Sequence, residues 1–142
     1  MRPSKLILII GWTIAMNSLD STIIMVANPN IQVDPGFVPS GSFIPTSTIQ
    51  WVNVLYSIAF GAFSIPAAKA GDRFGVTNVI RLATLCFVVF SVLCGISHYI
   101  TYDQTKWTYG GFYILLAARF FQGASGAFCQ ANTIAASAIL VE

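Results

Sequence analysis

The chain has 142 residues, of which 56% are hydrophobic and 8% are charged. A soluble domain carries about 25% charged residues, so this sequence cannot cover a water-soluble globule with polar groups and predicts a membrane protein. The net charge of +2 comes from seven basic and five acidic residues. Because the basic residues do not cluster, they exclude nucleic-acid recognition, which needs concentrated positive charge.

The first long apolar run covers about residues 6–27 and is long enough to cross a bilayer. About 20 helical residues, each rising about 1.5 Å, span the hydrocarbon core of about 30 Å. A signal peptide is the alternative, but no small-residue cleavage site follows and the apolar run continues past Asp20. Residues 28–48 follow with four prolines and two glycines, and we predict an irregular outer loop there.

Three further runs are predicted to span the membrane, at about residues 49–70, 79–100 and 112–137. Backbone amides in lipid must be paired within the segment, so each run is predicted to be a helix. A short charged turn and a polar, aromatic stretch separate these three runs. The sequence therefore predicts an all-α polytopic membrane protein with four transmembrane helices in one domain, residues 1–142.

Basic residues set the predicted orientation, because lysine and arginine favour the cytoplasmic side. Arg2 and Lys5 precede the first span, and the second joint carries Lys69, Arg73 and Arg81, whereas the first joint has no basic residue. We therefore expect a cytoplasmic amino terminus. The aromatic residues expected at the outer interface are Trp51, Tyr99, Tyr102, Trp107 and Tyr109.

Two charges fall inside the predicted spans: Asp20 in the first and Arg119 in the fourth. A charge at the bilayer centre costs about 2.5–3.5 kcal/mol on insertion scales, so such residues face a partner or a water-filled cavity. Counting from the outer ends of the two spans places both residues about 11 Å deep. We therefore predict that Asp20 and Arg119 pair, directly or through water.

Polar residues share a helical face with each of these charges. Asn17 precedes Asp20 by three residues, and Gln122 follows Arg119 by three. Small polar residues on the spans are explained by helix packing, but packing rarely requires a carboxylate. Desolvation favours the neutral form of a carboxyl group and a nearby arginine favours the charged form. A group held between these effects can exchange a proton, as proton-coupled transport requires.

The three cysteines, Cys86, Cys94 and Cys129, lie in apolar runs without a CxxC pair, which indicates small packing residues. His98 ends an apolar run and is typical of an interfacial residue. The sequence therefore predicts no metal site and no cofactor. It also contains no catalytic motif such as GxSxG, HExxH or a P-loop, so an enzyme is not expected.

Four motifs resemble those of the major facilitator superfamily. "GDRFG" at 71–75 resembles its cytoplasmic loop signature, and "RFFQGASGA" at 119–127 resembles its fourth-span motif. "LDSTIIMVANPNI" at 19–31 is similar to the first-span motif of the drug:proton antiporter branch, especially its fourteen-span group. "QWVNVLY" at 50–56 is similar to the opening of the second span there. The motifs occur in the family's order, and the resemblance covers essentially the whole chain.

The resemblance implies a proton-coupled transporter of drugs or other small molecules. It implies that Asp20 and Arg119 line a central cavity and take part in proton or substrate coupling. It also implies that Asp72 and Arg73 help to latch the cytoplasmic side, and that Gly75 allows a tight turn.

Two departures from the family loop weaken the implied latch. Ala68 stands where the family has glycine, and Val76 and Thr77 stand where it has basic residues.

Length is a further departure, because the family's carriers have twelve or fourteen spans in two halves. We therefore expect an amino-terminal fragment, truncated and inactive alone, whose partners in a complete carrier are the lipid bilayer, protons and a small-molecule substrate. Two alternatives stay open: a self-contained four-helix homo-oligomeric transporter, and a non-transporting assembly partner. The sequence does not distinguish a plasma-membrane from a vacuolar location.

Overall fold

The computed structural model describes residues 3–33, 37, 43–100 and 110–141, and within these ranges the chain is helical with short connections. Its elements are α1 (Pro3–Ile31), α2 (Thr46–Ile49), α3 (Trp51–Phe74), α4 (Val76–Ile100) and α5 (Gly110–Val141). Four helices, all except α2, are long and apolar enough to cross a membrane. The predicted all-α class with four candidate membrane helices is therefore confirmed.

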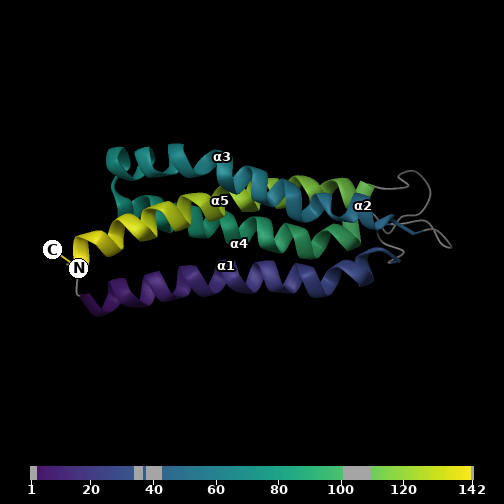
Figure 1. Cartoon of the computed structure of the whole chain (residues 1–142), viewed down its shortest axis with the longest axis horizontal. Helices are drawn as coiled ribbons and strands as arrows, with labels where there is room; N and C mark the ends of the chain where they lie inside the picture. Colours follow the sequence, from purple (N-terminus) through teal and green to yellow (C-terminus); the bar gives the residue numbers. More distant parts are fainter. Residues whose placement is uncertain (1–2, 34–36, 38–42, 101–109, 142) are drawn as a thin grey trace.

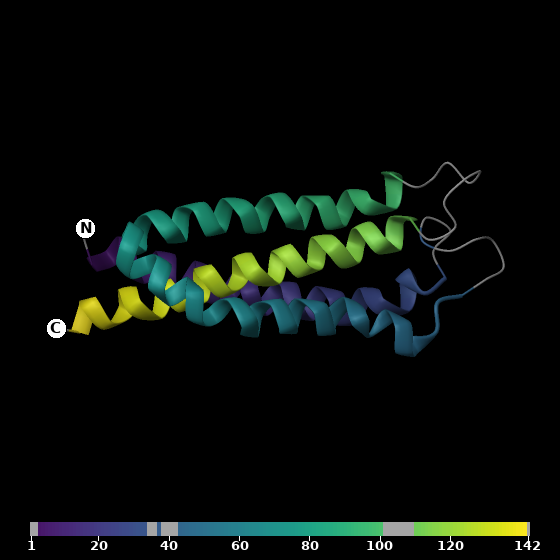
Figure 2. The same cartoon turned by 90° about the horizontal axis from the view of Figure 1, so that it is seen from above.

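The four long helices lie alongside one another in a bundle (Figure 1). Helix α5 packs extensively against both α3 and α4, and to a smaller extent against α1. The second view shows α5 running between α3 and α4 (Figure 2). We call the end of the bundle with the α3–α4 turn the Gly75 end; α1 begins there and α5 ends there. The opposite end, where α3 begins, is the Gln50 end.

The predicted boundaries of the loop at residues 28–48 are wrong at both ends, because helix occupies the first and last residues of this range. Helix α1 continues through Pro29 to Ile31, and a one-turn helix, α2, begins at Thr46. Proline lacks a backbone donor but its fixed φ is compatible with helix, so a single proline near a helix end removes one hydrogen bond without stopping the last turn. The backbone N–H of Gln32 still donates to the carbonyl of Asn28 at 3.3 Å.

Gly75 forms the turn between α3 and α4. Gly75 has φ 86° and ψ 127°, a conformation that side-chain-bearing residues rarely adopt. Its N–H donates to the carbonyl of Gly71 at 2.9 Å and so closes the last turn of α3. Helix α4 then begins at the next residue, which keeps the connection short enough to hold α3 and α4 as neighbours.

The bundle exposes many large apolar side chains and buries several polar ones, unlike a soluble protein. The apolar side chains of Leu8, Met25 and Ile65 are each more than 70% exposed, whereas the polar side chains of Gln122 and Asn132 are almost fully buried. Lipid covers an apolar exterior without cost, and polar side chains on facing helices hydrogen-bond to one another inside the bundle. The pattern therefore fits a bundle that lies in a membrane and places its polar groups around α5.

Candidate functional site

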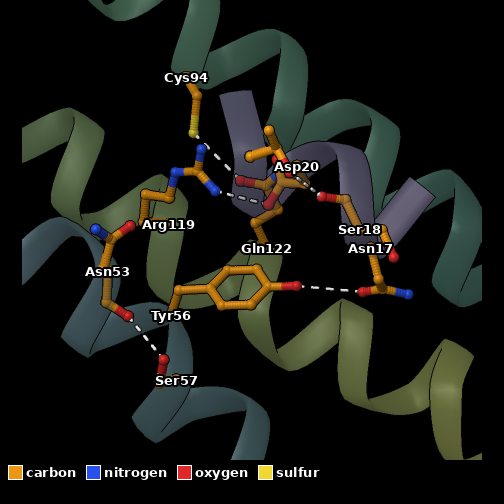
Figure 3. Close-up of polar contacts among 10 residues, drawn as sticks. Asn17, Ser18, Asp20, Asn53, Tyr56, Ser57, Cys94, Arg119 and Gln122 are labelled. Atoms are coloured by element: carbon orange, nitrogen blue, oxygen red, sulfur yellow. Dashed lines mark hydrogen bonds and ion pairs between the residues drawn. The ribbon is translucent and has the colours of Figure 1, made fainter. Parts of the chain in front are cut away.

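The two charges predicted within the spans meet inside the bundle. Arg119 Nη1 on α5 donates to Asp20 Oδ2 on α1 at 2.7 Å, and the two side chains are only 6% and 12% exposed (Figure 3). The contact confirms the pairing that their equal depths predicted. A charge-assisted hydrogen bond is stronger than a neutral one, and loss of either partner would leave the other charge buried without compensation.

Gln122 completes the surroundings of the Asp20 carboxylate. Gln122 Nε2 donates to Asp20 Oδ1 at 2.8 Å, so each carboxylate oxygen accepts a hydrogen bond from α5. Cys94 on α4 approaches from the other side, and its thiol donates to Gln122 Oε1 at 3.6 Å (Figure 3). The thiol contact favours the amide orientation in which the Gln122 nitrogen faces Asp20. Three helices therefore contribute to one network.

A second polar contact lies next to this network and joins α1 to α3. Tyr56 OH donates to Asn17 Oδ1 at 3.2 Å (Figure 3). Asn17 Nδ2 donates to the carbonyl of Thr13 at 2.9 Å. The Tyr56 ring lies under the guanidinium of Arg119, with 5.9 Å from Cζ to the ring centroid. This distance is within the range of cation–π attraction. The Asn17 contact is therefore coupled to the Asp20 pair through Tyr56.

Sequence reasoning selected Asp20, Arg119, Asn17 and Gln122, and the structure brings all four into connected contacts. It did not assign roles to Tyr56 or Cys94. Tyr56 was part of the quoted "QWVNVLY" motif, which was a usable signal, because that motif fixes its place near the start of the second span. Cys94 carried no such signal, and its contact depends on how α4 is rotated toward α5.

Two glycines of α5 allow α1 and α3 to approach closely. A Cβ atom built on Gly123 would overlap the carbonyl oxygen of Tyr56. One built on Gly126 would lie 3.1 Å from both Asn17 Oδ1 and Tyr56 OH. Close approach through glycine is the usual means of helix association in membranes. The "GASG" part of the fourth-span motif therefore supports the polar contacts sterically.

One donor of the site is left available. Within the described part of the chain, Arg119 Nε is buried and has no hydrogen-bond partner. A buried, unpaired N–H of a charged group is costly, so a site of this kind readily takes an acceptor such as water or a ligand oxygen. The guanidinium that binds Asp20 can therefore also offer its Nε–H donor to a second acceptor.

The predicted latch residues lie elsewhere. Asp72 and Arg73 are exposed in the last turn of α3, at the Gly75 end. They are 16 and 17 residues beyond Tyr56 on the same helix, which corresponds to about 24 Å. Arg73 lies over the ring of Phe74 at 5.5 Å. The structure therefore separates the turn residues from the Asp20 network, and the latch remains a prediction.

The chain is similar in sequence to known membrane transporters. The family model of the Major Facilitator Superfamily matches residues 10–141. The chain is 33% identical to the "Probable actinorhodin transporter" of Streptomyces coelicolor over 79% of this chain and 16% of that protein. It is 29% identical to the "Tetracenomycin C resistance and export protein" of Streptomyces glaucescens over 94% of this chain and 21% of that protein.

A fungal relative, "Efflux pump dotC" of Dothistroma septosporum, is 29% identical over 88% of this chain and 19% of its own length. The chain thus spans about a fifth of the length of these relatives. No solved structure matches significantly. The family match covers nearly the whole chain, and it agrees with the four apolar helices and the sequence motifs. The chain is therefore an integral, multi-pass membrane protein that belongs to the Major Facilitator Superfamily.

Proposed function

We propose that this chain contributes four membrane helices to a carrier that exchanges a small organic molecule for protons, with Asp20 as the proton-exchanging group. The observation that carries the proposal is the buried Asp20 carboxylate, which is held by Arg119 on one oxygen and by Gln122 on the other. The names of its relatives, which include a transporter, an export protein and an efflux pump, support the same function.

The coupling follows from the charges. While Asp20 is ionised, Arg119 is neutralised and α1 is bound to α5. A substrate with a positive or hydrogen-bond-donating group is attracted by the ionised carboxylate, and a proton on Asp20 removes this attraction. The proton and the substrate therefore compete for Asp20, so binding of one promotes release of the other, as exchange requires. While Asp20 is protonated, Arg119 lacks its counter-charge, and its Nε, which has no hydrogen-bond partner among the described residues, can take water as an acceptor.

The proposal also states which end of the bundle faces the cytoplasm and which membrane holds the protein. We place the Gly75 end in the cytoplasm, because the basic residues Lys69, Arg73 and Arg81 lie at this end. Asp72 and Arg73 then lie where a cytoplasmic latch is needed. The membrane is the plasma membrane or the vacuolar membrane, and no nucleic acid takes part.

The test uses a chimera in which residues 1–142 replace the matching segment of the tetracenomycin C export protein, which aligns with 94% of this chain. The chimera should restore export of tetracenomycin C from sensitive cells, and Asp20→Asn should abolish export when the two proteins are compared at matched abundance in the membrane. Ser57→Ala is the control, since its hydroxyl is exposed and bonds only to its own helix. Full export by the Asp20→Asn chimera would exclude Asp20 as the coupling group.

A second measurement does not depend on the chimera. Infrared spectra of the reconstituted chain should contain a protonated carboxyl band that grows as pH falls and is missing in Asp20→Asn. The band should remain in Asp72→Asn, because Asp72 is exposed at the end of α3. A spectrum in which no pH-dependent band is lost on Asp20→Asn would contradict proton exchange at this residue.

A further inference from the structure

A groove on the outside of the bundle lies apart from the Asp20 site. It has a volume of about 600 Å³ and is formed by α3, α4 and α5 near the Gly75 end. This volume is within the range of small-ligand sites, about 300–1,000 Å³. Its walls are mostly apolar side chains, with Phe74, Leu82 and Phe121 each at least half exposed. The groove is therefore open at the surface of the described helices.

The groove has the length of one leaflet. On α4 its lining runs from Asn78 to Phe90, and 12 residues at about 1.5 Å each correspond to about 18 Å. Half of a hydrocarbon core of about 30 Å is about 15 Å. The groove thus begins next to the α3–α4 turn and reaches approximately the bilayer midplane, which is the depth that a lipid acyl chain occupies.

The shallow end of the groove carries positive charge. Phe74 lines this end, and the exposed guanidinium of Arg73 lies over its ring at 5.5 Å. Arg73 and Arg81, each next in sequence to a lining residue, outnumber the acidic Asp72, and all three are exposed. Asn78, whose amide donates to the carbonyl of Phe74 at 3.5 Å, adds a polar group at the same end. Charge and shape together match an anionic headgroup above an apolar chain.

We propose that this groove binds one anionic phospholipid, with its phosphate next to Arg73 and one acyl chain along α4 past Cys86. The inference is independent of the transport function: it uses only the groove, its depth and the charge at its mouth. Lipid surrounds any membrane bundle. What distinguishes this groove is that it should bind a lipid with an anionic headgroup in preference to a neutral one.

Cys86 lines the groove eight residues below Asn78 and reports its occupancy. The experiment uses the purified chain in detergent micelles, with Cys94 and Cys129 replaced by serine. The rate of Cys86 alkylation by N-ethylmaleimide is measured while phosphatidylserine or phosphatidylcholine with identical acyl chains is added. Phosphatidylserine should slow the reaction at concentrations at which phosphatidylcholine has little effect. Equal protection by the two lipids would overturn the proposal.

Two variants that each remove one positive charge test whether the lipid headgroup lies next to Arg73. Arg73→Gln should raise the phosphatidylserine concentration for half-protection about fivefold, the effect of one basic residue near an anionic lipid. Lys69→Gln should shift it less than about twofold, because Lys69 is five residues before Phe74 and on the other side of α3. Equal shifts would indicate diffuse surface charge and contradict the site. If two chains instead form a disulfide through Cys86 and this dimer no longer binds the lipid, the groove is a contact between two copies of the chain, and the proposal is wrong.

Discussion

Asp20 and Arg119 are 99 residues apart in sequence, yet a 2.7 Å hydrogen bond joins Asp20 Oδ2 to Arg119 Nη1 inside the bundle. Many of the described side chains of α1 are apolar and exposed, and Asp20, bound by Arg119 and Gln122, joins α1 to α5 while the Asn17–Tyr56 contact joins it to α3. The pair therefore serves structure as well as the proposed chemistry, and the two roles can be separated by experiment.

The first prediction concerns the charge balance of this pair. Asp20→Asn or Arg119→Gln alone should reduce the free energy of unfolding by about 3–5 kcal/mol, because each leaves one buried charge without its partner. The double variant should recover a large part of this loss, since no unpaired charge remains. Unfolding in mixed micelles of increasing SDS content, followed by circular dichroism, measures all four proteins. Additive losses in the double variant would show that the two charges do not depend on each other.

The sequence predicted the four spans and the Asp20–Arg119 pair, but not the helix ends or the contacts of Tyr56 and Cys94. Apolar run lengths predict the spans because lipid requires internally bonded segments, and depth predicts the Asp20–Arg119 pair because each helical residue has a fixed rise. Helix ends were underestimated, because hydropathy detects only the part of a helix in hydrocarbon. Tyr56 and Cys94 were missed as site residues, because their contacts depend on the rotation of α3 and α4 about their own axes.

The second prediction separates the two contacts of Tyr56. Tyr56→Phe removes the hydroxyl that donates to Asn17 and keeps the ring under Arg119, so the loss of unfolding free energy should be about 0.6 kcal/mol. Tyr56→Leu removes the ring as well and should cost about 0.5–2 kcal/mol more, the range of a cation–π contact. The same SDS titration measures both. Equal stability of the two variants would mean that the ring face contributes nothing to Arg119.

The third prediction ranks three glycine-to-alanine substitutions by the space available to a methyl group. Gly123→Ala should cost about 1–3 kcal/mol, because the Tyr56 carbonyl on α3 blocks the Cβ position. Gly126→Ala should cost less, because the side chains of Asn17 and Tyr56 can move by a few tenths of an ångström. Gly61 has no atom within 4 Å of the Cβ position. Gly61→Ala is therefore the control, and better helix propensity should make it neutral or stabilising by up to about 1 kcal/mol.

Thermal unfolding of the three variants in one detergent gives this order directly. If Gly61→Ala is as destabilising as Gly123→Ala, the losses arise from helix effects common to all three sites. The close approach of α3 to α5 at Gly123 would then not contribute to the stability of the bundle.

The last prediction concerns the Gly75 end, where Asn132 fastens α3 to α5. Asn132 Nδ2 donates across the interface to the carbonyl of Ala67 at 3.0 Å, and also to Phe128 in its own helix at 2.9 Å. Asn132→Ala should cost about 1–2 kcal/mol of unfolding free energy, near the upper end for amide bonds between membrane helices. Ser57→Ala is the control, with an expected change within about 0.5 kcal/mol, since its bond is local and exposed.

Gly71 supplies the second half of this test. A Cβ on Gly71 would overlap Asn132 Oδ1, so Gly71→Ala alone must push the amide away from Ala67. In the Gly71→Ala, Asn132→Ala double variant the obstructing amide is absent and the methyl group has room. The double variant should therefore lose at least about 1 kcal/mol less than the two single losses combined, because residues in contact are energetically coupled. Simple additivity in SDS unfolding would show that the amide and the glycine do not share this space, and that the end of α3 is held to α5 by other contacts.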